Sequence, residues 1–117
     1  MKTTAAAALL LALGGFTNPC TAHVLSAQEC REGGDFIYDA ARARDNGMTR
    51  AAFIGRMRAD FQAIRSCPKQ LRWFAQDRDD EALLLSAARN VFDAPHDGEA
   101  HRRAFLAECM AHTASAH

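Results

Sequence analysis

Hydrophobic residues recur at every third or fourth position through most of the chain, and this spacing predicts helices joined by short turns. The first helix spans roughly residues 28–45, with Cys30, Gly34, Ile37 and Ala41 on one face. Ser26-Ala-Gln-Glu29 has the form of a capping box at its start. Asn46-Gly47 follows as a left-handed stop.

Two further helices are predicted by the same pattern. Thr49 can cap a helix over residues 50–66, whose apolar stripe consists of Phe53, Ile54, Met57, Phe61 and Ile64. Pro68 then favours a short helix or turn that carries Leu71, Trp73 and Phe74. The acidic run from Asp77 to Glu81 suits the positive end of the next helix, which ends before Pro95.

Asp97 can cap a last helix whose inward positions are Phe105, Leu106, Cys109 and Met110. No segment alternates apolar and polar residues with the β-branched content of a strand. The sequence therefore predicts an all-α fold, a compact four-helix bundle with an extra short helix or turn between helices two and three.

The N-terminus has the features of a secretory signal peptide over residues 1–27. Lys2 precedes an unbroken apolar run from Ala5 to Leu13, which falls well below the roughly 20 residues that span a bilayer. Small residues favour cleavage after Ala22 or Ala27. We therefore expect a periplasmic or secreted protein with no membrane span in the mature chain, a helical domain over 28–112 and a frayed tail over 113–117.

Composition and charge limit the number of domains and the kinds of partner. The 117 residues carry 14 basic and 14 acidic side chains, and this length and balance predict one domain with no electrostatic attraction to nucleic acid. Either cleavage also removes Cys20 and leaves Cys30, Cys67 and Cys109, so that one pair forms and one thiol remains.

The cysteine pairing is open at this point. Antiparallel packing of the first and last helices would bring Cys30 and Cys109 together, and this pair is the first choice. Cys30–Cys67 and Cys67–Cys109 are the alternatives. If Cys20 survives processing, two disulfides become possible and the remaining thiol disappears.

A resemblance rests on several segments: Cys30-Arg-Glu-Gly-Gly-Asp-Phe-Ile, Ala41-Arg-Ala-Arg-Asp-Asn-Gly-Met, Leu71-Arg-Trp-Phe with Asp77 after it, Val91-Phe, and Phe105-Leu with Cys109. Together they resemble a group of small exported all-helical proteobacterial proteins, to which we attach no activity. The resemblance implies a cysteine near each end of an exported helical domain. Cys67 departs from the group's pattern, which makes it the candidate free thiol.

Four features are candidates for chemistry. Cys67 precedes Pro68 at the start of a short helix, where the dipole would lower a thiol pKa; the alternative is an inert surface cysteine. His96, His101, His112 and His117 near Cys109 could bind zinc or copper, or be solvated. Arg72, Trp73 and Phe74 could form an exposed interaction surface, or plug the core. Gly33-Gly34 indicates close helix packing, or a ligand against the backbone.

No phosphate-binding loop, serine elbow, zinc-protease helix or other catalytic motif occurs in the sequence. We therefore predict no catalytic residues, no cofactor and no metal site. The expected function is that of a non-enzymatic exported helical protein that binds another protein or a small ligand. The alternatives are a redox or metal-handling protein that uses Cys67 or the histidine-rich end, and an envelope-stress chaperone or inhibitor of a secreted enzyme.

Overall fold

Four α-helices make up the computed structural model, which describes residues 26–68, 72–74 and 77–115. The helices are α2 (Ala27–Asp45), α3 (Arg50–Ile64), α4 (Arg78–Asp93) and α5 (Gly98–Ser115). No strand occurs among the described residues. The predicted all-α, compact four-helix architecture is confirmed. The predicted signal peptide, apart from Ser26 and Ala27, lies outside the described residues.

The helix starts follow the capping residues of the sequence. Ser26 Oγ accepts from the Glu29 amide at 3.4 Å, and Thr49 Oγ1 accepts from the Ala52 amide at 3.1 Å. Asp77 and Asp97 cap α4 and α5, each accepting from the amide three residues on. Each cap satisfies an amide that has no partner within its own helix.

The turn between α2 and α3 is made by Gly47. Its φ of +99° lies in the left-handed region that glycine adopts without strain. The Asn46-Gly47 stop is therefore confirmed.

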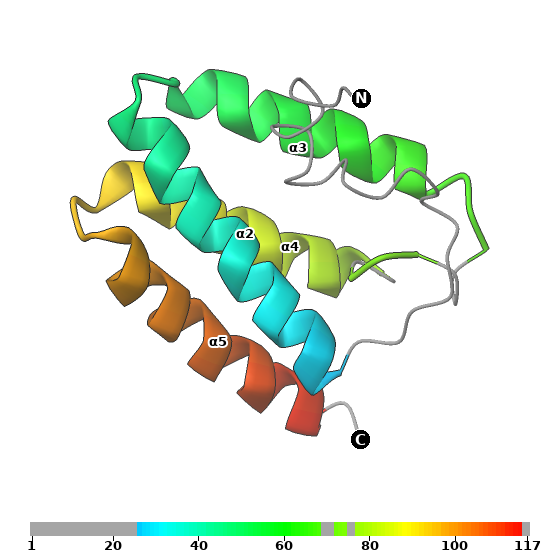
Figure 1. Ribbon diagram of the computed structural model, residues 1–117. Helices are drawn as coiled ribbons and strands as arrows, with labels where there is room; N and C mark the ends of the chain where they lie inside the picture. The colour runs from blue at the N-terminus through cyan, green and yellow to red at the C-terminus, as the bar shows by residue number, and fades with distance from the viewer. Residues whose placement is uncertain (1–25, 69–71, 75–76, 116–117) are drawn as a thin grey trace, which may run out of the picture.

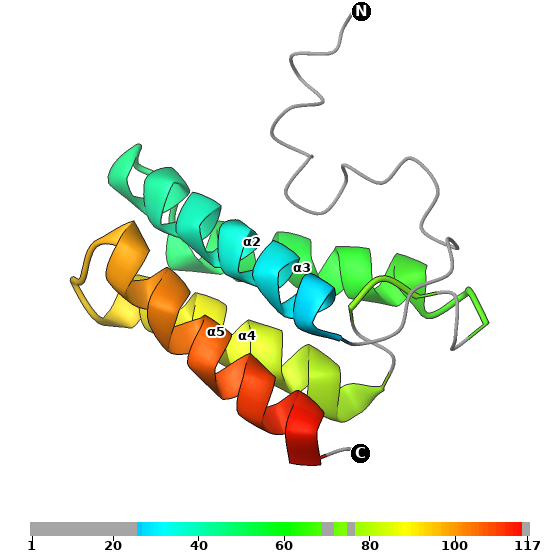
Figure 2. The same ribbon diagram turned by 60° about the horizontal axis from the view of Figure 1, so that its bottom comes forward.

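Helix α2 is central to the bundle. It runs antiparallel to α5, against which it packs most extensively, and also contacts α4, whereas α3 packs on α4 (Figures 1 and 2). The core is filled by the predicted inward positions of all four helices and by two aromatic rings from the α3–α4 connection. Its largest fully buried side chains are Phe61, Phe74, Phe105, Ile37, Met57, Leu84 and Val91.

A disulfide joins Cys30 near the start of α2 to Cys109 near the end of α5, with Cα atoms 5.6 Å apart. Both cysteines are completely buried. The preferred pairing of the sequence analysis is thus confirmed. In Figure 1 the first turn of α2 and the last turns of α5 lie side by side at the same end of the molecule.

Gly33 and Gly34 allow α5 to approach α2 closely. A Cβ atom at Gly33 would lie 2.8 Å from Phe105 Cε2 and 3.0 Å from Phe74 Cε2, and one at Gly34 would lie 3.3 Å from Arg102 Cγ. The cost of glycine inside a helix, about 1 kcal/mol relative to alanine, is offset by this packing. The pair is therefore explained by close helix packing.

The structure selects one predicted alternative and changes one predicted boundary. The described residues between α3 and α4 form turns and bends, so the connection is a turn where it can be described. Helix α5 continues through Ser115, and Thr113 Oγ1 lies 3.5 Å from Cys30 Sγ. Residues 113–115, which the sequence analysis places in a frayed tail, are helical because the α2–α5 contact extends to them.

Candidate binding groove

Helix α4 divides its side chains between the core and an outward face. Leu84, Ala88 and Val91 recur at helical spacing and are completely buried. The residues between them carry polar groups, and Ser86, Asn90 and Asp93 are exposed. One amphipathic helix therefore supplies both part of the core and a row of polar groups.

An open groove with a volume of about 320 Å³ lies along this outward face. Its lining comes from α4, with one carboxylate from α5: Ser86, Ala87, Arg89, Asn90, Asp93 and Glu108. Glu108 is exposed beside the buried Cys109. The disulfide that holds α5 against α2 thus also fixes the helix turn from which Glu108 projects.

Contacts from α2 and α5 secure the end of α4 near the groove. Arg44 Nη1 donates to the Val91 carbonyl at 2.8 Å and to the Ala94 carbonyl at 3.4 Å. His101 Nε2 lies 3.1 Å from the same Ala94 oxygen. These groups satisfy carbonyls that the last turn of a helix leaves without amide partners, so the backbone under the groove is held from both neighbouring helices.

Asp93 is the only lining residue with a described ion pair. Arg50 of α3 binds it with two hydrogen bonds, Nε to Oδ1 at 2.9 Å and Nη2 to Oδ2 at 3.3 Å. This planar two-point contact orients the carboxylate. Because its charge is balanced by Arg50, Asp93 forms a fixed rim to the groove.

The remaining polar side chains of the groove make no polar side-chain contact of their own with the described residues. Within the described part of the chain, the side chains of Ser86, Arg89, Asn90 and Glu108 form no hydrogen bond or ion pair. They offer a guanidinium, a carboxylate, an amide and a hydroxyl. This set can pair with a carboxylate, an amine and the donors and acceptors of a peptide backbone.

The candidate interaction surface at Arg72, Trp73 and Phe74 is largely in the interior. Trp73 is 6% exposed and Phe74 is completely buried, so their rings pack in the core, as the second alternative of the sequence analysis has it, and they do not form an exposed surface. Arg72 is half-buried and donates to the carbonyls of Cys67 and Arg65 at 3.0 and 3.2 Å. The segment fills the core because Gly33 leaves space for the Phe74 ring.

Two carboxylates of α2 hold this segment. Glu32 Oε1 accepts from Trp73 Nε1 at 2.9 Å, and Glu29 Oε2 accepts from the Phe74 amide at 2.7 Å. Phe74 has a φ of +55°, a left-handed conformation that is uncommon for a bulky residue. The carboxylates and the ring packing together maintain that conformation.

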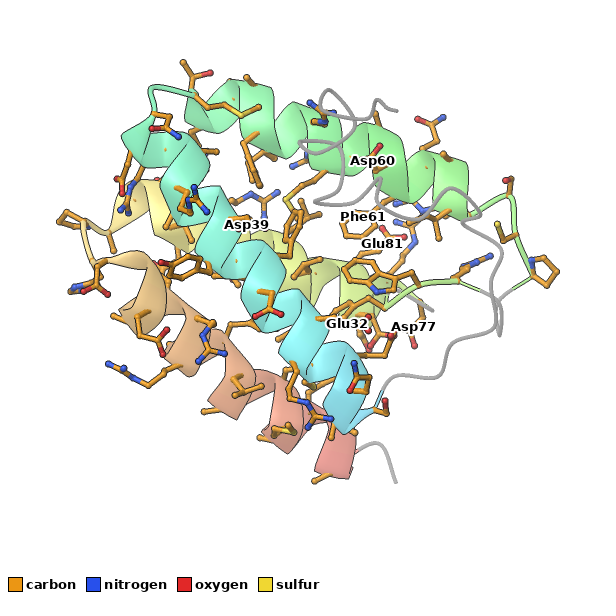
Figure 3. The ribbon with its side chains drawn as sticks, in the orientation of Figure 1. Glu32, Asp39, Asp60, Phe61, Asp77 and Glu81 are labelled. Carbon is orange, nitrogen blue, oxygen red and sulfur yellow. A yellow bond between two sulfur atoms is a disulfide. The ribbon has the colours of Figure 1, made fainter. Side chains whose placement is uncertain are left out.

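Further carboxylates lie at the same end of the bundle, where Figure 3 shows Asp77 and Glu81 at the start of α4, between α2 and α3. Asp80 and Glu81, both at the start of α4, are buried. Glu81 forms a two-point ion pair with Arg65, and Asp80 lies 3.1 Å from His112 Nε2. These contacts join α4 to α3 and α5, and they account for the buried charges structurally.

Cys67 is 2% exposed and disulfide-bonded, and no described cysteine is free. The prediction of a free thiol at Cys67 is therefore wrong for the full-length chain. A free thiol at Cys67 is expected only if Cys20 is removed with the leader, and Cys20 lies outside the described residues. The alternative that the sequence analysis left open, two disulfides and no remaining thiol, agrees with the bonded state of Cys67.

The histidines of the C-terminal region are separated by the fold. His101 is buried and near the end of α4, the His96 ring packs against it at a tilt with ring centroids 5.6 Å apart, and His112 faces Asp80. His117 lies outside the described residues. No group of three or more metal-binding side chains is found among the residues described.

Comparisons with protein-family models, curated proteins and solved structures give no match for this chain. None of the four helices, as far as the structure describes them, is long and apolar enough to cross a membrane. The fold and the groove thus define an all-helical, disulfide-linked domain with an open polar groove.

The groove was missed by the sequence analysis, which used α4 only for its buried stripe. Its polar side chains from Ser86 to Asp93 could have been found as the opposite face of that stripe. The contribution of Glu108 depends on how α5 lies beside α4, for which the sequence gives no local signal.

Proposed function

We propose that this chain is a non-enzymatic, exported helical protein that binds an extended, polar segment of another protein in the α4–α5 groove. The observation that carries the proposal is the convergence of four polar side chains without described partners on one hollow. Export is supported by the signal-peptide pattern and by the buried disulfide, which persists in oxidising compartments.

The shape of the groove favours a peptide over a small molecule. Pockets for small molecules usually enclose most of the ligand and are lined by apolar groups, whereas this hollow is open and mostly polar. An extended peptide lies across such a surface and pairs its backbone with side-chain donors and acceptors. Arg89 and Glu108 add opposite charges, so the preferred segment carries a carboxylate and an amine.

The alternative of thiol chemistry at Cys67 has less support. Its sulfur is already in a disulfide and its side chain is almost completely buried. Attack on a disulfide requires access for the attacking thiolate. The groove residues, in contrast, face solvent.

The test is an NMR titration of the isotopically labelled protein with a tetrapeptide that contains one lysine and one glutamate. We expect shift changes that centre on residues 86–93 and on Glu108 and that weaken as salt rises. A tetrapeptide of alanines with blocked ends is the control for non-specific binding. Shift changes spread over other helices, or none at millimolar peptide, would refute the proposal.

A charge-reversal variant supplies the matched control. Arg89→Glu should abolish the shift changes, whereas Arg58→Glu, which makes the same charge change at an exposed position of α3, should leave them intact. Equal effects of the two variants would mean that net charge, not the groove, governs binding.

A further inference from the structure

The charged side chains of the α4–α5 groove follow a fixed order along its length. Helices α4 and α5 are antiparallel neighbours (Figure 2), and His112 of α5 lies 3.1 Å from Asp80 near the start of α4. Glu108 precedes His112 by one helical turn, so it lies about one turn beyond Asp80, near the Ser86 end of the groove. Arg89 stands three residues after Ser86, a rise of about 5 Å along α4. The groove therefore presents a carboxylate first and a guanidinium about one turn later.

Asp93 closes the other end of the groove. It follows Arg89 by one turn on the same face of α4, and Arg50 of α3 holds both of its carboxylate oxygens, at 2.9 and 3.3 Å. A bound chain that continued past a carboxylate at Arg89 would have to cross this fixed ion pair. A chain that ends at Arg89 does not meet it, so the rim favours an occupant with a terminus at this point.

We propose, resting on the proposed function of the groove, that its occupant is the carboxyl terminus of another protein whose last residue is basic. The terminal carboxylate binds Arg89 and Asn90, and the positive side chain of the same residue binds Glu108. A guanidinium can hold a carboxylate with two parallel N–H donors, and the Asn90 amide can donate a further hydrogen bond. The Ser86 hydroxyl is then available to the last peptide group of the partner.

A single basic residue at a carboxyl terminus matches the spacing of the two groove charges. An extended lysine carries its ammonium about 6 Å from its Cα, because a four-carbon stem separates the two. The guanidinium of Arg89 and the carboxylate of Glu108 project from positions about one helical turn apart along the groove. An internal segment would need an acidic and a basic residue to reach both charges, and it would immobilise two side chains where a terminal lysine immobilises one. The terminal residue therefore uses both charges at the lower cost in side-chain entropy.

The test is an NMR titration of the labelled protein with two acetylated tetrapeptides, each of three alanines followed by lysine. One peptide ends in a free carboxylate and the other in an amide. We expect the free carboxylate to give a Kd about tenfold lower, because amidation removes a charge-assisted hydrogen bond to Arg89. Equal Kd values for the two peptides would overturn the proposal. Free lysine should bind more weakly than the peptide, because its α-ammonium would lie beside Arg89; tighter binding of free lysine would indicate an amino-acid site instead.

A third peptide separates this proposal from the proposed function on which it rests. It carries lysine and glutamate between two alanines, and both of its ends are blocked. If it binds as tightly as the peptide with a free carboxylate, the groove takes internal segments, so the carboxyl-terminal assignment is wrong while the proposed function stands. If none of the three peptides shifts the groove residues at millimolar concentration, the proposed function is wrong as well.

Variants assign each end of the bound residue to its partner in the groove. Arg89→Gln should raise the Kd of the free-carboxylate peptide about tenfold and leave that of the amidated peptide unchanged, whereas Glu108→Gln should raise both. Arg58→Gln and Asp79→Asn are the matched controls, because they remove charges of the same sign at exposed positions of α3 and α4, and they should leave both Kd values unchanged. If Arg89→Gln weakens both peptides equally, Arg89 does not bind the terminal carboxylate and the proposal is wrong.

Discussion

Gly33 determines how closely α2, α5 and the α3–α4 connection can pack. The rings of Phe74 and Phe105 occupy the space in which a side chain would begin, and both rings are buried. We expect Gly33→Ala to lower the free energy of unfolding by about 1–3 kcal/mol, because buried rings have little room to move. Urea denaturation measures the change.

Gly55 supplies the control for helix propensity. It lies on the exposed face of α3, with no atom within 4 Å of an added Cβ. Gly55→Ala should stabilise the protein by up to about 1 kcal/mol, since alanine is the better helix former. If both substitutions stabilise the protein, the rings at Gly33 are not a steric limit.

Asp60, which is half-buried, should destabilise the folded protein in a pH-dependent way. Burial raises the pKa of the Asp60 carboxyl, and nearby Arg56 lowers it by a smaller amount. The ionised form is therefore disfavoured in the folded state, with a cost that is absent below the unfolded pKa and complete above the folded one. Asp60→Asn should melt at a higher temperature than the wild type at pH 7, and the difference should vanish toward pH 3.

The Glu99 carboxyl should affect stability with a pH dependence opposite in sign to that of Asp60. A hydrogen bond from Arg102 lowers the pKa of the Glu99 carboxyl, so its contribution to stability is present above the unfolded pKa and is lost as the pH falls through the folded one. Glu99→Gln should melt slightly below the wild type at pH 7 and converge with it in acid. Parallel pH profiles for the two variants would contradict both assignments.

At the scale of elements, the α3–α4 connection depends on the first turns of α2. Glu29→Ala would leave the buried Phe74 amide without its carboxylate acceptor. We expect a loss of about 1–3 kcal/mol in the free energy of unfolding, and a smaller loss for Glu29→Gln, which keeps an acceptor oxygen. Urea denaturation followed by fluorescence of Trp73, the single tryptophan, measures both variants. If Glu29→Gln lowers the free energy of unfolding as much as Glu29→Ala does, the stabilisation comes from the charge of the Glu29 carboxylate and not from its acceptor oxygen.

The helices and their ends could be predicted from the sequence because their signals are local. Thr49, Asp97 and Gly47 act within a few residues of themselves, and the inward stripes depend only on helical spacing. The role of Glu29 could not be predicted in this way. It fits a local capping box, but its carboxylate accepts from an amide 45 residues away.

The groove and the bonding of Cys67 likewise depend on contacts between distant segments, which local sequence signals do not predict. The polar face of α4 is visible in the sequence, whereas its neighbour Glu108 depends on tertiary packing. Trp73 and Phe74 have the composition of an interaction surface, but the space beside Gly33 places them in the core. Only contacts between distant segments separate these alternatives.

For the whole molecule, the Cys30–Cys109 disulfide is expected to contribute strongly to stability. It closes a loop over a separation of 79 residues, for which the loss of unfolded-state entropy corresponds to roughly 4–5 kcal/mol. Cys30→Ala/Cys109→Ala should lose stability of this order in urea denaturation without reductant. A loss below about 1 kcal/mol would indicate that helix packing alone holds α2 and α5 together.

The same bond makes the described domain almost a closed ring. Its first and last helices meet where their Cα atoms are 5.6 Å apart, and a short peptide linker could join them. New ends could then be opened at the exposed Asn46-Gly47 turn, since exposed turns tolerate chain breaks. We therefore expect a circular permutant that starts with α3 to keep the same core.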